Sequence, residues 1–254
     1  MGGSCYFASI GYHSCSNLVG MNKGTLYIVA TPIGNLSDMT FRAVEILKTV
    51  DAIYAEDTRV SKKLLNHYGV STKVFSFNAH DERKSVAQIF TQLEKGENVA
   101  LVTDAGTPCI SDPGTRLVGM AHDAGYVVVP IPGASAVVAA VSVAGMPAPW
   151  AFVGFLPQKK GRQTALKEIE VSESTIVCFE STHRLKKLLE ELVKTLSDDR
   201  IICVCRELTK QFEEIKRGTA QEVLAYYLDH ADKIKGECVV IISGTSFRKK
   251  LIET

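Results

Sequence analysis

Short runs of apolar residues alternate with longer amphipathic stretches along the chain from Thr25 onward. The apolar runs are rich in β-branched and aromatic residues and end at turn residues, which is typical of buried strands. The stretches between them have helical spacing, as where Phe41, Val44 and Leu47 recur every three residues. Near-continuous apolar strands separated by helices predict an α/β fold with a mostly parallel sheet covered on both faces. In the first half the pattern predicts strands at 25–30, 52–55, 73–77, 99–102 and 127–130, and helices at 41–49, 84–93, 116–124 and 134–144.

A segment rich in proline and glycine, GMPAPW at 145–150, interrupts this pattern directly after an apolar helix. Such segments commonly separate domains. We therefore expect an N-terminal α/β domain at 21–147 and a C-terminal α/β domain at 148–254. Some connections in the second half are short, which predicts a mixed sheet there. Its expected strands are 151–155, 175–179, 201–205, 213–218 and 237–242, and its expected helices are 185–195 and 220–228.

Residues 1–20 follow neither pattern. They contain no Lys or Arg and no sustained apolar stretch, so we do not expect them to form a signal peptide. Because Met21 and the NKGTLYIVA after it form a more natural start, we interpret 1–20 as a tag, an upstream extension or a disordered tail. No apolar run in the chain approaches the roughly 20 residues of a membrane span, and we expect no membrane association.

Charge and cysteine usage narrow the class of protein. The 254 residues include 29 Lys and Arg and 28 Asp and Glu, giving a formal net charge of +1. This balance argues against a protein that coats nucleic acid by bulk charge, but it allows local basic patches. The seven scattered cysteines favour a reducing, cytoplasmic compartment over a disulfide framework. Cys203 and Cys205 share a face of one expected strand, and we interpret them as core thiols and expect no metal site.

The segment VALVTDAGTPCISDPG at 99–114 has the strongest signature of a ligand site. An apolar strand runs directly into Asp104 and Gly106, and ligands of parallel sheets bind beyond the carboxyl ends of strands. Asp104 offers hydrogen-bond acceptors, and Gly106 permits close approach of the backbone. The alternative is a simple turn followed by the N-cap of a helix at Ser111 or Asp112. Two turn motifs within eleven residues favour the ligand loop.

Several common catalytic motifs are absent. The first strand is not followed by G-x-G-x-x-G, and the chain contains neither G-x-x-x-x-G-K-[ST] nor H-E-x-x-H, which disfavours an ordinary dinucleotide site, a P-loop and a zincin. GASAV at 133–137 does not fit G-x-S-x-G because its last position is Val137. Ser135 is therefore interpreted as a helix-start residue or a ligand contact.

Polar clusters follow three further strand-like runs. AEDTR at 55–59 places Asp57 and Arg59 after the second strand, where the alternative is a solvated helix N-terminus favoured by the helix dipole. FESTHR at 179–184 places His183 beside Glu180 and Arg184, which makes this group a candidate polar site. RELTKQFEE at 206–214 follows another apolar run, and ATPIGNL at 30–36 follows the first.

These motifs occur together, in order, in one bacterial family. ATPIGNL, AEDTR, DAGTPCISDPG, PGASA, GFLPQKKGR, FESTHR and RELTKQFEE resemble the ribosomal RNA small-subunit methyltransferase I family, within the tetrapyrrole-methylase-like (class III) methyltransferases. The resemblance covers about 24–244. The sequence departs from the family pattern at Cys109, where glycine is common, and at Thr182, where proline is usual.

The resemblance implies a fold, a cofactor and a reaction. Members of the family use S-adenosylmethionine to methylate the ribose 2′-hydroxyl of a cytidine in the decoding region of small-subunit ribosomal RNA. They have two α/β domains with the cofactor between them and are typically homodimers. The implied cofactor contacts are Pro32, Asp104, Ala105, Gly106, Thr107, Ile110, Ser111 and Ser135 in the first domain, and Phe179, Leu208 and Glu237 in the second.

The reaction calls for an acceptor of the hydroxyl proton, because a ribose hydroxyl is a poor nucleophile. We expect this acceptor in the pair Asp57 and Arg59 or in the group Glu180, His183 and Arg184. The sequence leaves two other functions open: methylation of a tetrapyrrole or other small molecule on the same fold, and a non-catalytic cofactor-binding or ribosome-associated protein. The loop GFLPQKKGR favours RNA, because Lys159, Lys160 and Arg162 suit phosphate contacts.

Overall fold

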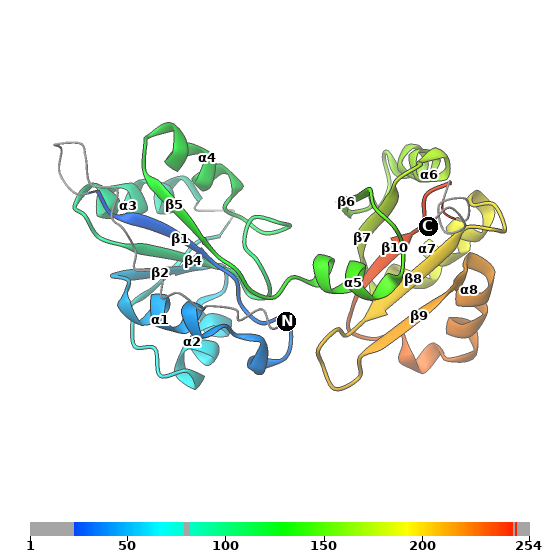
Figure 1. Cartoon of the computed structure of the whole chain (residues 1–254), viewed down its shortest axis with the longest axis horizontal. Helices are drawn as coiled ribbons and strands as arrows, with labels where there is room; N and C mark the ends of the chain where they lie inside the picture. Colours follow the sequence, from blue (N-terminus) through cyan, green and yellow to red (C-terminus); the bar gives the residue numbers. More distant parts are fainter. Residues whose placement is uncertain (1–22, 79–81, 246, 248–254) are drawn as a thin grey trace, which may run out of the picture.

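The computed structural model describes residues 23–78, 82–245 and 247 of the chain. It contains two α/β units that follow one another in sequence, each built on a five-stranded sheet (Figure 1). Residues 1–20, interpreted above as a tag, extension or tail, lie outside the described residues. Within the described part of the chain, no helix is long and apolar enough to cross a membrane.

The first sheet is entirely parallel, as its apolar runs predict. Its strand order is β3-β2-β4-β1-β5, and β2 and β4 are buried along their whole length because helices cover both faces. Helices α3 and α4 pack on one apolar core, and α1 and α2 pack on the other. The elements are β1 (Thr25–Val29), the 3-10 turn η1 (Leu36–Asp38), α1 (Phe41–Thr49), β2 (Ala52–Ala55), α2 (Thr58–His67), β3 (Val74–Ser76), α3 (Glu82–Glu94), β4 (Val99–Val102), α4 (Thr115–Asp123) and β5 (Val127–Ile131).

The second sheet is mixed, which confirms the expectation from its short connections. Its order is β6-β7-β10-β8-β9, in which β6 and β7 are parallel and the other neighbours are antiparallel. Helices α6, α7 and α8 share one apolar core with this sheet. The elements are α5 (Ala136–Ala144), β6 (Trp150–Phe155), α6 (Arg162–Val171), β7 (Thr175–Ser181), α7 (Thr182–Thr195), β8 (Ile201–Arg206), β9 (Glu214–Thr219), α8 (Ala220–Asp229), the 3-10 turn η2 (Ala231–Lys233) and β10 (Glu237–Ile242).

Helix α5 belongs to the second unit, although the expected domain boundary at 147/148 put it in the first. Val137, Ala140 and Ala144 pack with Val239 and Ile241 on the face of the second sheet opposite α6, α7 and α8 (Figure 1). Apolar side chains are buried against whichever sheet leaves a face uncovered, and α1 to α4 already cover both faces of the first sheet. Helix α5 therefore packs with the second sheet, and the expected domain boundary at 147/148 stays a prediction.

The apolar runs locate all ten described strands to within two residues, but two described helices were not expected. Helix α2 buries only Ser61 and Leu65, and α6 buries Leu166, Ile169 and an arginine. Such sparse apolar faces carry little periodic signal. The α/β fold class and its division into a parallel and a mixed sheet agree with the structure.

Candidate functional site

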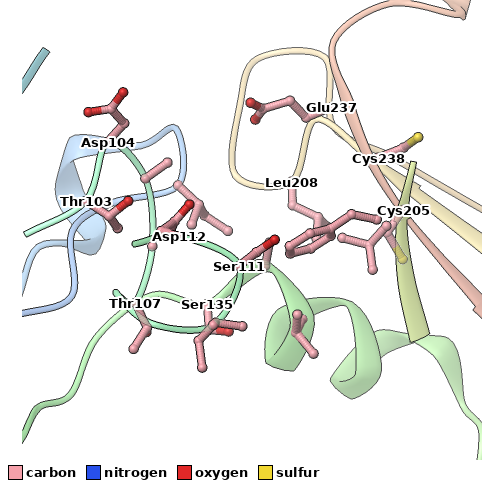
Figure 2. Close-up of a pocket in the computed structure, with 18 of the residues that line it drawn as sticks. Thr103, Asp104, Thr107, Ser111, Asp112, Ser135, Cys205, Leu208, Glu237 and Cys238 are labelled. Carbon is pink, nitrogen blue, oxygen red and sulfur yellow. The ribbon is translucent and has the colours of Figure 1, made fainter. Parts of the chain in front are cut away.

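A pocket of about 530 Å³ lies where the two units meet (Figure 2). Its first wall, from the first unit, consists of Ile33, Glu56 and pocket-lining residues of loop 103–112. Its second wall, from the second unit, consists of Phe155 and pocket-lining residues of 179–181, 205–210 and 236–239. The start of α5, at 135–137, lies between the walls. The first wall thus occupies the carboxyl ends of β1, β2 and β4, where parallel sheets bind ligands.

Backbone pairing fixes the loop of the first wall. Thr31 and Gly106 exchange two backbone hydrogen bonds, with N···O distances of 2.8 and 3.1 Å, and the Thr31 hydroxyl donates to the carbonyl of Thr103 at 3.1 Å. Gly106 has φ +87°, and a Cβ there would lie 3.2 Å from Cγ2 of Ile33. The loop therefore needs glycine at this position to reach the end of β1.

Cys109 shapes the same loop from the other side. It adopts φ +68°, the left-handed region that favours glycine, and it stands at a position where the family pattern commonly has glycine. Its thiol occupies the space over Gly114: a Cβ on Gly114 would lie 2.8 Å from the sulfur. The two residues are thus complementary, with the side chain at 109 and the bare backbone at 114.

The first wall presents three carboxylates, on Glu56, Asp104 and Asp112. The Thr103 hydroxyl donates to Oε2 of Glu56 at 3.1 Å, and the Asp57 N–H donates to Oδ1 of Asp104 at 3.0 Å. Burial, reinforced by the neighbouring carboxylates, raises the pKa of Glu56 and of Asp112 above the ordinary range. Among the described residues, none of the three forms an ion pair with Lys or Arg. The negative charge of this wall is therefore not neutralised by an ion pair, and the nearby Arg59, which binds Asp57, acts on Asp104 only through its more distant charge.

The carboxylates of the second wall have cationic partners. Lys210 Nζ lies 3.0 Å from Oε1 of Glu207 and 2.9 Å from Oε2 of Glu237. Arg184 Nε lies 2.7 Å from Oε1 of the buried Glu180, and an Arg162 nitrogen lies 3.9 Å from its Oε2. The alkyl chain of Lys210 also rests over the first unit, because a Cβ on Gly34 would lie 2.4 Å from Lys210 Cγ.

The second wall also provides the apolar surface of the pocket. The rings of Phe155 and Phe179 lie 5.5 Å apart, and Phe155 is 54% exposed. Leu208 and Val239 line the pocket beside them. An apolar wall facing a charged one suits a ligand that combines a flat ring with polar or ionic groups.

Most of the expected cofactor residues line this pocket. Ten of the eleven do so, and Pro32 is buried next to Ile33 without lining it. Their contact with a ligand remains a prediction. The ten are Asp104, Ala105, Gly106, Thr107, Ile110, Ser111, Ser135, Phe179, Leu208 and Glu237.

The expected catalytic residues are not brought together. Of the five, only Glu180 lines the pocket, and it is 2% exposed and held by arginines. Asp57 caps α2 and binds the guanidinium of Arg59, whose hydrogen bonds lower the pKa of Asp57 to about 2. Arg59 and His183 are exposed outside the pocket lining, and Arg184 is turned to Glu180. A proton acceptor with so low a pKa is weak, and a catalytic role for Asp57 stays a prediction.

Arg162 requires a correction. Its guanidinium is 5% exposed, donates to Glu191 at 2.5 and 2.8 Å and donates to the carbonyl of Pro157 at 3.0 Å. A side chain committed to buried partners is not available for RNA phosphates. Lys159 and Lys160 are exposed, so the basic part of this loop consists of the two lysines.

Sequence reasoning missed several polar or aromatic residues of the pocket, among them Glu56, Asp112, Phe155 and Lys210. Glu56 directly precedes the expected Asp57, and Asp112 was interpreted only as a helix cap. Lys210 lay within a quoted motif without a role, as did Phe155. Position after an apolar run was the available signal, but it does not say which of two adjacent side chains faces the pocket.

Comparisons with known proteins agree with this architecture. Residues 25–224 match the family model described as Tetrapyrrole (Corrin/Porphyrin) Methylases. The chain is 46% identical over 225 residues to "Ribosomal RNA small subunit methyltransferase I" of Escherichia coli O157:H7, covering 88% of this chain and 79% of that protein. It is 46% identical to the protein of that name from Bacillus subtilis strain 168, covering 89% and 77%.

Solved structures share the fold at low identity. Cobalt precorrin-4 methyltransferase matches with a TM-score of 0.63 and 19% identity, covering 86% of this chain and 94% of that chain. Uroporphyrin-III-C-methyltransferase from Thermus thermophilus matches with a TM-score of 0.61 and 15% identity, covering 87% and 94%. Among the residues that the structure describes, no three His, Cys, Asp or Glu side chains could hold a metal ion together. The paired sheets, the pocket at their junction and the extent of the sequence identity place the chain in the ribosomal RNA small subunit methyltransferase I family, on the tetrapyrrole methylase fold.

Proposed function

We propose that this protein methylates the ribose 2′-hydroxyl of a cytidine in the decoding region of small-subunit (16S) ribosomal RNA, with S-adenosylmethionine as the methyl donor. The observation that carries the proposal is the pocket itself, in which loop 103–112 faces the ends of β7 and β8 in a chain of this family. The names of the relatives support a ribosomal RNA substrate. The ribose position and the cytidine rest on the family resemblance.

The pocket fits S-adenosylmethionine by charge and by shape. The cofactor carries a sulfonium and an ammonium besides one carboxylate, and the first wall offers three carboxylates that form no ion pair with Lys or Arg among the described residues. Phe179, Leu208 and Val239 offer an apolar surface to its flat adenine ring. When bound, the cofactor supplies a methyl group on a sulfonium centre. The residues proposed to hold it are the ten expected cofactor residues that line the pocket.

The protein's own groups align the reactants and exclude water. Loop 103–112, pinned to β1 through Gly106, holds its polar groups in fixed positions, and preorganised groups contribute most to reactions of this kind. The loop after β6 carries the exposed Lys159 and Lys160 beside the pocket residue Phe155. We propose that these lysines contact phosphates of the RNA.

Methyl incorporation from labelled S-adenosylmethionine tests the proposal. We expect label in small ribosomal subunits that lack the modification, at one cytidine ribose located by nuclease digestion and mass spectrometry. Parallel reactions contain naked 16S rRNA or a porphyrinogen. Label in the porphyrinogen alone would identify a small-molecule methyltransferase, and cofactor binding without label in any acceptor would identify a non-catalytic protein; either result refutes the proposal.

The lysines of the β6–α6 loop provide a second test. The double substitution Lys159→Ala and Lys160→Ala removes two phosphate contacts, so the slope of log affinity against log salt should fall by about 2. The matched control replaces the adjacent exposed lysines Lys62 and Lys63 of α2 with alanine. Equal slopes for the two double variants would place RNA binding elsewhere.

The family resemblance also implies a homodimer in the cytoplasm, and both remain part of this proposal. Sedimentation equilibrium of the full chain tests the oligomeric state. A mass of one chain, 27.7 kDa, at micromolar concentration would contradict the dimer.

A further inference from the structure

The first wall contains a carboxylate whose surroundings differ from those of its neighbours. Glu56 follows β2, lines the pocket and accepts a hydrogen bond from the Thr103 hydroxyl at 3.1 Å. Its side chain is half-buried, and the neighbouring charges are those of Asp104 and Asp112. Thr103 and Asp104 follow β4, the strand next to β2, so the cluster is assembled from adjacent strand ends.

The other carboxylates of the pocket are less suited to accept a proton. Glu180, Glu207 and Glu237 each have an Arg or Lys nitrogen within 4 Å, so their carboxylates are already engaged by cations of the protein. Asp104 is exposed and accepts the N–H of Asp57. Asp112 shares the burial and the raised pKa of Glu56, so the two are distinguished by geometry: the Thr103 hydroxyl donates a hydrogen bond to Glu56 at 3.1 Å and orients that carboxylate, and the charge of Asp112 raises the pKa of Glu56.

Asp57 and Arg59, at the start of α2, do not change the comparison between Glu56 and the other carboxylates. Arg59 binds Asp57 with guanidinium N···O distances of 2.6 to 3.2 Å and forms no ion pair with Glu56 among the described residues. The two adjacent acidic residues thus have opposite surroundings. One is neutralised by an arginine at a helix start, and the other faces the pocket among carboxylates.

We propose that Glu56 is the catalytic residue that accepts the proton of the attacking hydroxyl, oriented by Thr103 and tuned by Asp112. The inference rests on the proposed function. The O–H bond of the ribose hydroxyl breaks and its proton goes to Glu56, while the oxygen forms the new bond to the methyl carbon. The electron pair of the broken carbon–sulfur bond stays on sulfur, and Glu56 later releases the proton to water.

Single-turnover methylation of small subunits by Glu56→Gln tests this role. Glutamine keeps the size and can still accept the Thr103 hydrogen bond, but it is not a base. Loss of a general base costs about 10²- to 10⁴-fold in rate, and the dissociation constants of S-adenosylmethionine and of the subunit should stay within about threefold. Asp112→Asn should lower the rate less, because it removes only the tuning charge. Glu45→Gln, on the exposed face of α1, is the control and should match the wild type.

Chemical rescue separates a base from a structural group. In Glu56→Ala, added formate should restore part of the rate because it can occupy the vacated space and accept the proton. Infrared difference spectra of the ligand-free wild type and Glu56→Gln give a readout without turnover: the Glu56 carboxyl should titrate above the ordinary range of glutamate.

The outcomes separate the two proposals. A wild type that labels the subunit beside a Glu56→Gln variant of equal rate overturns the role of Glu56 alone. A rate loss that merely follows weaker cofactor binding, or that formate does not relieve, also overturns it. A wild type that never labels a ribose hydroxyl overturns the proposed function and this inference together.

Discussion

The two walls of the pocket contain the same number of carboxylates and use them differently. The carboxylates of the second wall, on Glu180, Glu207 and Glu237, form ion pairs with Lys210 and two arginines, so protein cations neutralise their charge. Those of the first wall, on Glu56, Asp104 and Asp112, form no ion pair with Lys or Arg in the part of the chain that the structure describes, and they accept hydrogen bonds from a hydroxyl and an N–H group. The difference teaches that residue type alone does not define a site. A carboxylate becomes available to a ligand when no protein cation neutralises it.

The largest expected effect on stability comes from removing a buried cation that neutralises carboxylates in the second unit. Arg162→Met leaves Glu191 and Glu180 near it without their buried partner, and removal of one partner of a buried pair costs about 3–5 kcal/mol. Urea unfolding measures the free energy. The control Lys160→Met, at an exposed position two residues earlier, should change it by about 0.5 kcal/mol or less. A loss below about 1 kcal/mol for Arg162→Met would mean that the ion pair is not essential.

The next effect concerns the backbone of the first wall. Gly106→Ala forces a side chain into φ +87° and against Ile33, and should lower the free energy of unfolding by about 1–3 kcal/mol. It should also weaken cofactor binding, since loop 103–112 moves. Gly119→Ala, inside α4 with open space around it, is the matched control and should stabilise by about 1 kcal/mol. Equal effects at both positions would show that the loop tolerates displacement.

A smaller effect tests whether the free charge of the first wall recognises a cation. Asp104→Asn should reduce the preference for S-adenosylmethionine over its thioether product, whose sulfur carries no charge, about threefold to fivefold, near 1 kcal/mol for a partly exposed pair. Calorimetric dissociation constants for both ligands give the ratio. Glu237→Gln should reduce it less, because Lys210 already compensates that charge. A larger change at Glu237 would reverse the roles of the two walls.

The smallest effect concerns how stability depends on pH, which should have opposite signs for Glu56 in the first wall and Glu207 in the second. Burial raises the pKa of Glu56, so the folded protein holds that proton to higher pH than the unfolded chain, and stability falls as pH rises through this window. Glu56→Gln should therefore be slightly more stable than the wild type at pH 7, by about 0.5 kcal/mol or less, with no difference below about pH 4.

Glu207 should behave in the opposite way. Burial alone would raise its pKa, but the Glu237 N–H and Lys210 outweigh burial and lower it. Its stabilisation is present above the ordinary pKa of glutamate and is lost as pH falls through the lowered value. Glu207→Gln should therefore melt below the wild type at pH 7. Melting temperatures at pH 4 and pH 7 compare the two variants, and shifts of the same sign in both would contradict the contrast.

The strands were the most predictable part of the fold, for a physical reason. A strand buried on both faces, such as β2 or β4, must be apolar throughout, so its limits can be read directly from the sequence. Helix α5 was predictable as a helix but not in its placement. A helix made of Ala, Val and one Ser has no polar face to indicate which sheet it covers.

The position of the site was predictable from the sequence, but the ion pairs that its side chains form were not. Loop 103–112 follows an apolar strand, and that order alone places it at a sheet edge. The pairing of Arg162 with Glu191, and of Lys210 with Glu207 and Glu237, depends on how separate elements pack. Lys159, Lys160 and Arg162 look alike in sequence, yet Arg162 starts α6 and turns inward. A helix start can reverse the direction of a side chain within two residues.

The place of β10 in the second sheet sets the order in which the molecule is completed during synthesis. All five strands of the first sheet precede residue 132, so that sheet can form while the rest of the chain is still being translated. In the second sheet, β10 is the last strand in sequence but lies between β7 and β8. Until it emerges, β6 with β7 and β8 with β9 are separate pairs, and the pocket lacks Glu237 to Val239. A nascent chain that has not yet added β10 therefore has a complete first wall and an incomplete second wall, and the whole pocket forms only once β10 joins the sheet.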